Sequence, residues 1–213
     1  GGGDAESNFR LRLAVDRARS QNMPKENIER AIKRGTGESK EGNTFEEVFY
    51  EGYAPHAVAL MIQCLTENRN RTVADVRHIL SRSGGNLGEG GSVGWQFKRI
   101  AYFSMPAAGL DFDKIFELAV EGGADDVTSD DESIEIFAPV ESFKIISDAL
   151  HKAKIQLEEA ELRMIPTQEM ELDVEKTLQV LRTVEALEEL DDVTNVYSSL
   201  RISEEAMAAL ESE

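Results

Sequence analysis

The sequence predicts an α+β protein of three domains: an N-terminal helical domain and two α/β domains, one inserted in the other. The first 34 residues show helical apolar spacing and end at a polar, glycine-bearing linker, GTGESKEGN, at 35–43. The segment 100–166 follows the strand–helix–strand–strand–helix–strand order of the ferredoxin-like fold. The segment 45–99 lacks a helix and a strand to cover its apolar surface, and 174–200 has the pattern of both.

The domain boundaries follow from these three observations. We expect residues 1–42 to form the helical domain, 43–99 with 167–213 to form a discontinuous α/β domain, and 100–166 to form the inserted ferredoxin-like domain. The 213 residues are 41% hydrophobic, which is enough to build real cores. The chain begins with three glycines and no Met, so we expect the helical domain to be incomplete.

Residues 8–34 are expected to form a helical hairpin. Gln21-Asn22 interrupts the pattern, Pro24 suits the first position of a second helix, and Gly35 is a natural stop. Lys33 and Arg34 fall in the last turn, where cations favour the helix dipole. The apolar positions at helical spacing are Leu11, Ala14, Val15 and Ala18 in the first helix and Ile28, Ala31 and Ile32 in the second.

The next segment changes to a strand pattern. Glu46 to Tyr53 and Ala57 to Leu65 read as strands joined by a turn at 54–56. Thr72 is expected to cap a helix that Gly84-Gly85 ends, with Asp75 three residues on as in a capping box. A glycine-rich loop and a strand from Val93 to Lys98 would follow.

The acidic half of the chain alternates strands and helices. The string DDVT occurs at Asp125–Thr128 and at Asp191–Thr194, each time between a helix and a strand. Either the two junctions converged on the same residues, or an α/β unit was duplicated.

The expected strands are Ile100–Met105, Asp126–Ser129, Ser133–Ala138, Leu157–Ile165 and Val193–Leu200, and the expected helices are Phe112–Glu121 with Asp111 as cap, Glu141–Ala153, 174–190 and a short one from Ser203.

Charge divides the chain more sharply than its net value of -18 suggests. Residues 1–100 hold 15 Lys and Arg against 13 Asp and Glu, a balance of +2, whereas residues 101–213 hold 8 against 28, a balance of -20. The second half is therefore expected to be repelled by nucleic acid and anionic lipid, so that polyanion contacts belong to the first hundred residues. The acidity alternatively serves solubility alone.

Patterns for catalysis and metal binding are weak. The string Gly90 to Gly94 fits G-x-S-x-G, but a helix precedes it and a strand follows, the reverse of a nucleophile elbow. We therefore expect Ser92 to be a hydrogen-bonded turn serine. The glycine run fits no nucleotide-binding pattern, and is either a flexible loop that touches a macromolecular partner or a plain connection. One cysteine, Cys64, and three histidines without ligand spacing lead us to expect no cofactor, no metal and no enzymatic activity.

The strongest local signal is Glu67 to Thr72, ENRNRT, which leads into the helix carrying Arg77 and Arg82. Two arginines and two amides at a helix N-terminus suit a phosphate, because backbone N–H groups and the positive dipole end point there. Internal pairing, such as Arg71 with Asp75 or Glu67, is the alternative.

These strings resemble the YebC family of bacterial and mitochondrial gene-expression proteins. Besides ENRNRT, the resemblance rests on LRLAV at 11–15 with NMP at 22–24, YEGY at 50–53, DVRH at 75–78, GGNLG at 84–88, MIP at 164–166 and DDV at 191–193. It implies three domains and no enzymatic activity. Members are described as DNA-binding transcriptional regulators, and others, including mitochondrial translational activators, are linked to the ribosome. The family pattern carries a basic helical segment ahead of the glycine run, which this chain lacks.

We therefore expect a non-enzymatic, DNA-binding transcriptional regulatory protein of the YebC type. A ribosome-associated RNA-binding translation factor and a protein-interaction module are the alternatives. The partners would be DNA or ribosomal RNA, with the ribosome or another protein on the acidic domains and no membrane, in the bacterial cytoplasm or, less favoured, the mitochondrial matrix. The candidate nucleic-acid-binding residues are Arg10, Arg12, Arg17, Arg19, Lys33, Arg34, Asn68, Arg69, Asn70, Arg71, Arg77 and Arg82.

Overall fold

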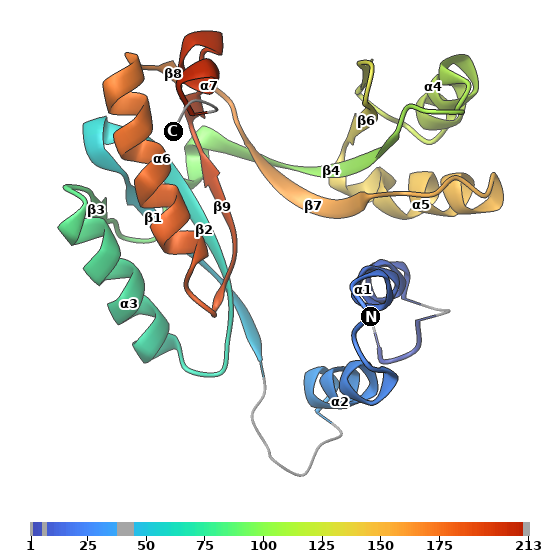
Figure 1. Cartoon of the computed structure of the whole chain (residues 1–213), viewed down its shortest axis with the longest axis horizontal. Coiled ribbons are helices and arrows are strands. Elements are labelled where there is room, and N and C mark those ends of the chain that lie inside the picture. The colour runs from blue at the N-terminus through green and yellow to red at the C-terminus, as the bar shows by residue number, and fades with distance from the viewer. Residues whose placement is uncertain (1, 6–7, 38–44, 211–213) are drawn as a thin grey trace. The chain divides into compact units, whose positions relative to one another are not determined.

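The computed structural model describes residues 2–5, 8–37 and 45–210 (Figure 1). It is an α+β protein, as predicted, whose chain divides into two compact units. One unit comprises Gly1–Asn43 with Arg99–Arg163, and the other Thr44–Lys98 with Met164–Glu213. Within the described residues, no helix is both long and apolar enough to cross a membrane.

The N-terminal segment forms the predicted helical hairpin, with α1 at Phe9–Ser20 and α2 at Lys25–Gly35. The Asn8 side chain accepts a hydrogen bond from the Leu11 N–H at 3.2 Å and so satisfies one free donor at the start of α1. Pro24 stands immediately before α2, one position earlier than predicted. The two apolar stripes face each other, and Val15 and Ile28 are buried.

The second unit is built on a sheet of order β3-β1-β2-β9, with β1 at Glu46–Tyr53, β2 at Ala59–Thr66, β3 at Asn86–Leu87 and β9 at Val193–Ser198. The β1–β2, β1–β3 and β2–β9 pairs are antiparallel. Helices α3 (Arg69–Arg82) and α6 (Val174–Glu188) bury Val76, Leu80, Val180 and Leu187 together with Leu60, Ile62 and Cys64 of β2. Three short elements complete the unit: β8 at Met170–Glu171, paired in parallel with β10 at Leu200–Arg201, and α7 at Glu204–Leu210.

Strand β2 is buried on both faces, which explains its nearly unbroken apolar run. Its even-numbered residues face the helices, whereas Ala59 and Met61 pack with Val93, Phe97 and Tyr197 on the opposite face. The strand begins at Ala59 and not at Ala57 as predicted, because the 3₁₀ turn η1 (Pro55–Ala57) precedes it and Ala57 has a φ of 62°.

The other unit holds a sheet of order β5-β6-β4-β7. This is the strand order of the ferredoxin-like fold that the sequence pattern predicted. The helices pack over Phe103, Met105, Ile134 and Ile136 of this sheet. Its elements are β4 at Phe97–Pro106, α4 at Phe112–Glu121, β5 at Asp126–Ser129, β6 at Ser133–Ala138, the 3₁₀ turn η3 at Val140–Ser142, α5 at Phe143–Lys152 and β7 at Glu159–Pro166.

Three further predicted elements differ from the structure, one helix and two strands. Helix α3 begins at Arg69, capped by Asn68, and Thr72 lies buried inside it, because other side chains take up its hydroxyl. The predicted strands Val93–Lys98 and Ile100–Met105 are one strand, β4, which begins at Phe97 after the 3₁₀ turn η2 at Gly94–Gln96. Lys98 and Arg99 are exposed and lie within this strand.

Candidate nucleic-acid interface

The N-terminus of α3 presents the predicted basic cluster. The Asn68 side chain accepts a hydrogen bond from the backbone N–H of Arg71 at 3.2 Å. The backbone N–H of Asn68 donates to the Thr66 hydroxyl at 2.8 Å. Arg69, Asn70 and Arg71 follow in the first turn, and all three are exposed. The cap fixes the backbone of this turn, which carries the side chains of Arg69 and Arg71.

Asp192 is the centre of a hydrogen-bond cluster under this turn. Its carboxylate accepts from Arg71 Nη2 at 2.9 and 3.0 Å, from the Thr72 hydroxyl at 2.7 Å and from the Thr66 hydroxyl at 3.2 Å. Burial alone would raise the pKa of Asp192, but the hydrogen bonds from Arg71 and Thr72 outweigh it and hold the pKa below its usual value. The cluster ties α3 to the loop that precedes β9.

The predicted internal partners of Arg71 were wrong. Asp75 and Glu67 were the expected candidates, but the ion pair joins Arg71 to Asp192, 121 positions along the chain. The sequence placed Asp192 only at a junction between a helix and a strand. The Asp191–Thr194 junction string was the available signal, but nothing local linked it to Arg71.

Arg69 makes a second ion pair, from its Nε to a Glu46 carboxylate oxygen at 2.6 Å. More than half of each side chain stays exposed, at 63% and 55%. Exposed pairs of this kind contribute about 0–1 kcal/mol and are screened by salt, so a phosphate can compete for the guanidinium. The Arg69 carbonyl also accepts the Tyr50 hydroxyl at 3.2 Å, which anchors the backbone of the first turn to β1.

The remaining basic residues of α3 lie further along the helix. Helical periodicity places Arg71, His78 and Arg82 on one face, with Asp75 between them, and places Arg77 on the neighbouring flank with Asn70. Arg77, His78 and Arg82 are all exposed. Asn70, Arg71, Arg77, His78 and Arg82 are therefore exposed on two adjacent faces of α3, and Arg71 is paired with Asp192.

The basic residues of the hairpin have less defined roles. Arg12 is half-buried, and its Nε donates to the Ala5 carbonyl at 3.1 Å. Arg19, Lys33 and Arg34 are exposed. The side chains of Arg10 and Arg17 lie outside the described residues.

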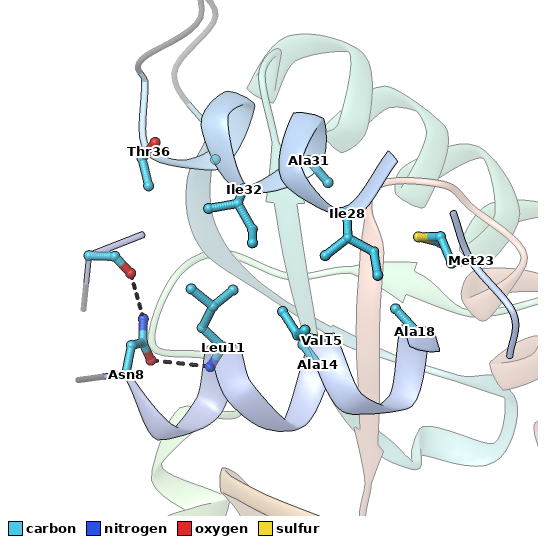
Figure 2. Close-up of a pocket in the computed structure, with 12 residues that line it drawn as sticks. Asn8, Leu11, Ala14, Val15, Ala18, Met23, Ile28, Ala31, Ile32 and Thr36 are labelled. Carbon is cyan, nitrogen blue, oxygen red and sulfur yellow. Dashed lines mark hydrogen bonds between the residues drawn. The ribbon is translucent and has the colours of Figure 1, made fainter. Parts of the chain in front are cut away.

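The inner surface of the hairpin forms an apolar cavity of about 610 Å³. Figure 2 shows Leu11 and Val15 of α1 pointing toward Ile28 and Ile32 of α2, with Asn8 at one end. Among the side chains that the structure describes, none that lines this cavity is titratable.

The glycine-rich loop is anchored by a residue that sequence reasoning missed. The Glu51 carboxylate accepts hydrogen bonds from the N–H groups of Gly91, Val93 and Gly94, each at 2.7 Å. Burial alone would raise the pKa of Glu51, but these three bonds outweigh it and hold the pKa below its usual value. The Glu51 carbonyl also accepts the Gly88 N–H at 2.8 Å, so one residue of β1 binds both ends of this stretch.

Ser92 differs from its prediction. Its hydroxyl oxygen is buried and has no hydrogen-bond partner within the described part of the chain, whereas a hydrogen-bonded turn serine was expected. The side chain packs against Gly88, where an added Cβ would lie 2.3 Å from Ser92 Oγ. Steric fit under the loop therefore replaces a turn hydrogen bond.

The Cys64 thiol is not activated. Cys64 is buried against α3 and α6, and burial together with the Asp192 charge raises the pKa of its thiol to about 12. Across residues 2–5, 8–37 and 45–210, no three His, Cys, Asp or Glu side chains gather in a way that could hold a metal ion.

Known proteins match this chain along its whole length. The family model for the TACO1/YebC second and third domain matches residues 45–200, and the model for the TACO1/YebC N-terminal domain matches residues 1–38. A "Probable transcriptional regulatory protein" of Chlorobaculum parvum is 49% identical over 214 residues, covering 100% of this chain and 85% of the relative. One from Geobacter sulfurreducens is 46% identical over 210 residues, covering 99% and 84%.

A solved structure agrees. The crystal structure of a conserved hypothetical protein from Aquifex aeolicus matches with a TM-score of 0.83 and 42% sequence identity, covering 96% of this chain and 84% of that one. Sequence and fold lead to the same conclusion: the chain belongs to the TACO1/YebC family.

Proposed function

We propose that this chain is a non-enzymatic regulator of gene expression that binds nucleic acid. The observation that supports this proposal is the set of exposed arginines on α3. Arg69 lies at the capped N-terminus of the helix, and Arg77 and Arg82 lie further along it. Guanidinium groups in such an array suit the phosphates of a nucleic acid backbone. The exposed Arg19, Lys33 and Arg34 of the N-terminal helices would add further phosphate contacts.

The distribution of charge supports this assignment. The first hundred residues balance at +2, whereas residues 101–213 balance at -20. A polyanion would be attracted to α3 and repelled by the ferredoxin-like sheet and its helices. The acidic segments would then face protein or solvent.

We propose the domain organisation that the sequence suggested: 1–42, then 43–99 with 167–213, and 100–166 inserted between them. The pairing of β9 with β2 supports a discontinuous domain, because a strand near the C-terminus completes a sheet begun at residue 46. The strand order β5-β6-β4-β7 supports a separate ferredoxin-like sheet in the insertion.

Duplex DNA is the first target we propose, because the curated relatives are named transcriptional regulatory proteins. RNA of the ribosome is the second, and one observation favours it. The exposed surface of α3 offers arginines but one amide side chain, Asn70, within the helix, which is too few for reading base edges in a major groove. A translation factor that relies on phosphate contacts needs no such readout.

The test is a double charge reversal, Arg77→Glu with Arg82→Glu, which spares the Arg71–Asp192 pair. Binding to labelled duplex DNA and to a ribosomal RNA hairpin is measured by fluorescence anisotropy across a salt series. Loss of two phosphate contacts is expected to weaken binding and lower the slope of log K against log salt by about 2.

The matched control is Lys114→Glu with Lys144→Glu, which makes the same charge change on exposed side chains of α4 and α5. It is expected to leave the slope unchanged. Wild-type affinity for both nucleic acids in the α3 variant, with an unaltered melting temperature, would contradict the assignment. A preference for the RNA hairpin over the duplex would select the translation role.

A further inference from the structure

The sequence holds one tryptophan, Trp95, and 74% of its surface is exposed. It lies in η2, between Val93, which is 0% exposed, and Phe97, which is 8% exposed. These two neighbours fill the core on that face of the sheet with Met61 and Tyr197. Trp95 is therefore not part of the core, and most of its large ring meets solvent.

Hydrogen bonds of the preceding loop residues position the Trp95 ring. Glu51 fixes the backbone N–H groups of Val93 and Gly94, the residues directly before Trp95, at 2.7 Å each. The Ser92 carbonyl accepts both the indole Nε1–H at 3.1 Å and the Tyr53 hydroxyl at 3.2 Å. A ring that is already ordered loses little conformational entropy when it binds a partner.

The same hydrogen bond limits what the indole can recognise. Its single polar group donates to Ser92 within the protein, so the exposed remainder is an apolar π surface. Such a surface binds by stacking on a planar or apolar group. The choice of ligand then depends on what surrounds the ring.

The charges along the neighbouring sequence favour a polyanion with planar groups. Residues 66–100 hold six Lys and Arg against three Asp and Glu, and Arg82 and Lys98 are exposed on either side of the loop in the sequence. Gly90 and Gly91 would have nothing within 4 Å of an added Cβ, so the loop leaves open space where a chain can approach. A nucleic acid strand offers phosphates for the cations and a base for the indole.

We propose that Trp95 is a stacking platform for an unpaired nucleobase of single-stranded nucleic acid. This inference rests on the proposed nucleic-acid-binding function and favours the second of its two targets, ribosomal RNA, whose loops and bulges carry unpaired bases. Paired bases inside a duplex are stacked on one another and cannot reach the ring. The platform reads no base sequence, because every base has a π face.

The single tryptophan makes the test direct, since protein emission excited beyond tyrosine absorption reports on Trp95 alone. Full-length protein is titrated with oligouridylate, oligothymidylate, an abasic oligodeoxynucleotide of equal length and a blunt duplex, all at one salt concentration. We expect quenching by the two strands that carry bases. The abasic strand and the duplex are expected to leave the emission unchanged.

Variants separate stacking from charge. Base–aromatic stacking contributes about 1–3 kcal/mol, so Trp95→Ala is expected to weaken binding of labelled oligouridylate by about 5- to 150-fold. Trp95→Phe keeps an aromatic ring and is expected to retain most of the affinity. Binding of the abasic strand should be the same for all three proteins, and their melting temperatures should agree because the side chain is exposed.

Two results would overturn the inference, and they have different consequences for the proposed function. If labelled strands bind but neither quench the emission nor lose affinity in Trp95→Ala, the stacking platform is wrong and the proposed function stands. If no nucleic acid binds wild-type protein at low salt, the proposed function fails and the platform fails with it. Equal affinity for abasic and base-containing strands belongs to the first case.

Discussion

Two partly buried carboxylates in the second unit organise its two candidate contact regions in different ways. Asp192 accepts hydrogen bonds from the side chains of Arg71, Thr72 and Thr66. Glu51 accepts hydrogen bonds from backbone N–H groups of the glycine-rich loop. In both, the pKa lies below its usual value because hydrogen bonds to the charged form outweigh burial.

The difference concerns what each carboxylate depends on. The Asp192 cluster depends on the identity of its partners, because replacing Arg71 or Thr72 would remove the hydrogen bonds which that side chain donates to Asp192. The Glu51 cluster depends on loop conformation, since any residue except proline supplies an N–H. Gly91, with a φ of 87°, holds a backbone conformation that side-chain-bearing residues rarely adopt. Because the loop is fixed through its backbone, the exposed Trp95 side chain stays available for a partner.

The largest expected effect is that of Glu51→Gln. The neutral amide has one oxygen in place of a charged pair, so at least one loop N–H loses a charge-assisted bond, and we expect unfolding free energy to fall by about 2–4 kcal/mol. Urea denaturation measures this loss, and amide exchange should accelerate at Gly91, Val93 and Gly94. The control is Glu46→Gln on the same strand, whose exposed pair with Arg69 contributes at most about 1 kcal/mol. Equal losses in the two variants would contradict the anchoring role.

A smaller effect is expected for Asp192→Asn. The amide keeps an acceptor for one hydroxyl but loses the charge that Arg71 pairs with, and we expect a loss of about 1–2 kcal/mol because the carboxylate is only partly buried. Asp191→Asn, at the exposed neighbouring position, serves as the control and should stay near wild type. A loss at Asp192 as large as that at Glu51 would show that side-chain and backbone anchoring are equivalent here.

The smallest effect is expected from protonation. Both carboxyl groups have a lower pKa in the folded protein than in the unfolded chain, so their stabilisation is present above about pH 4–5 and is lost as the pH falls through the folded values. The urea midpoint of wild-type protein should therefore drop on acidification. The Glu51→Gln and Asp192→Asn variants should each drop less steeply, and a variant with the wild-type slope would show that its carboxyl does not contribute.

Local patterns predicted much of the fold. The bounds of β1, α4, β5 and β6 agree with the predicted ones because residue periodicity and turn residues act within a few positions. Asp111 occupies the predicted N-cap position of α4, but its side chain makes no capping hydrogen bond. The two-residue strands β3, β8 and β10 were missed as separate elements, since so short a pairing has no pattern of its own. Both Thr72 and Asn68 are residue types that cap helices, and only the structure shows that Asn68 caps α3.

The sequence by itself determined the α+β class, the helical hairpin, the partition of charge and the basic character of α3. These follow from composition and from spacing along the chain, which tertiary contacts do not alter. Only the tertiary structure decided that Arg71 pairs with Asp192 and that Glu51 fixes the loop carrying Trp95. The physical reason is that both contacts require strands to be paired first: β9 must lie beside β2, and β1 must meet the loop, before any of these groups can approach one another.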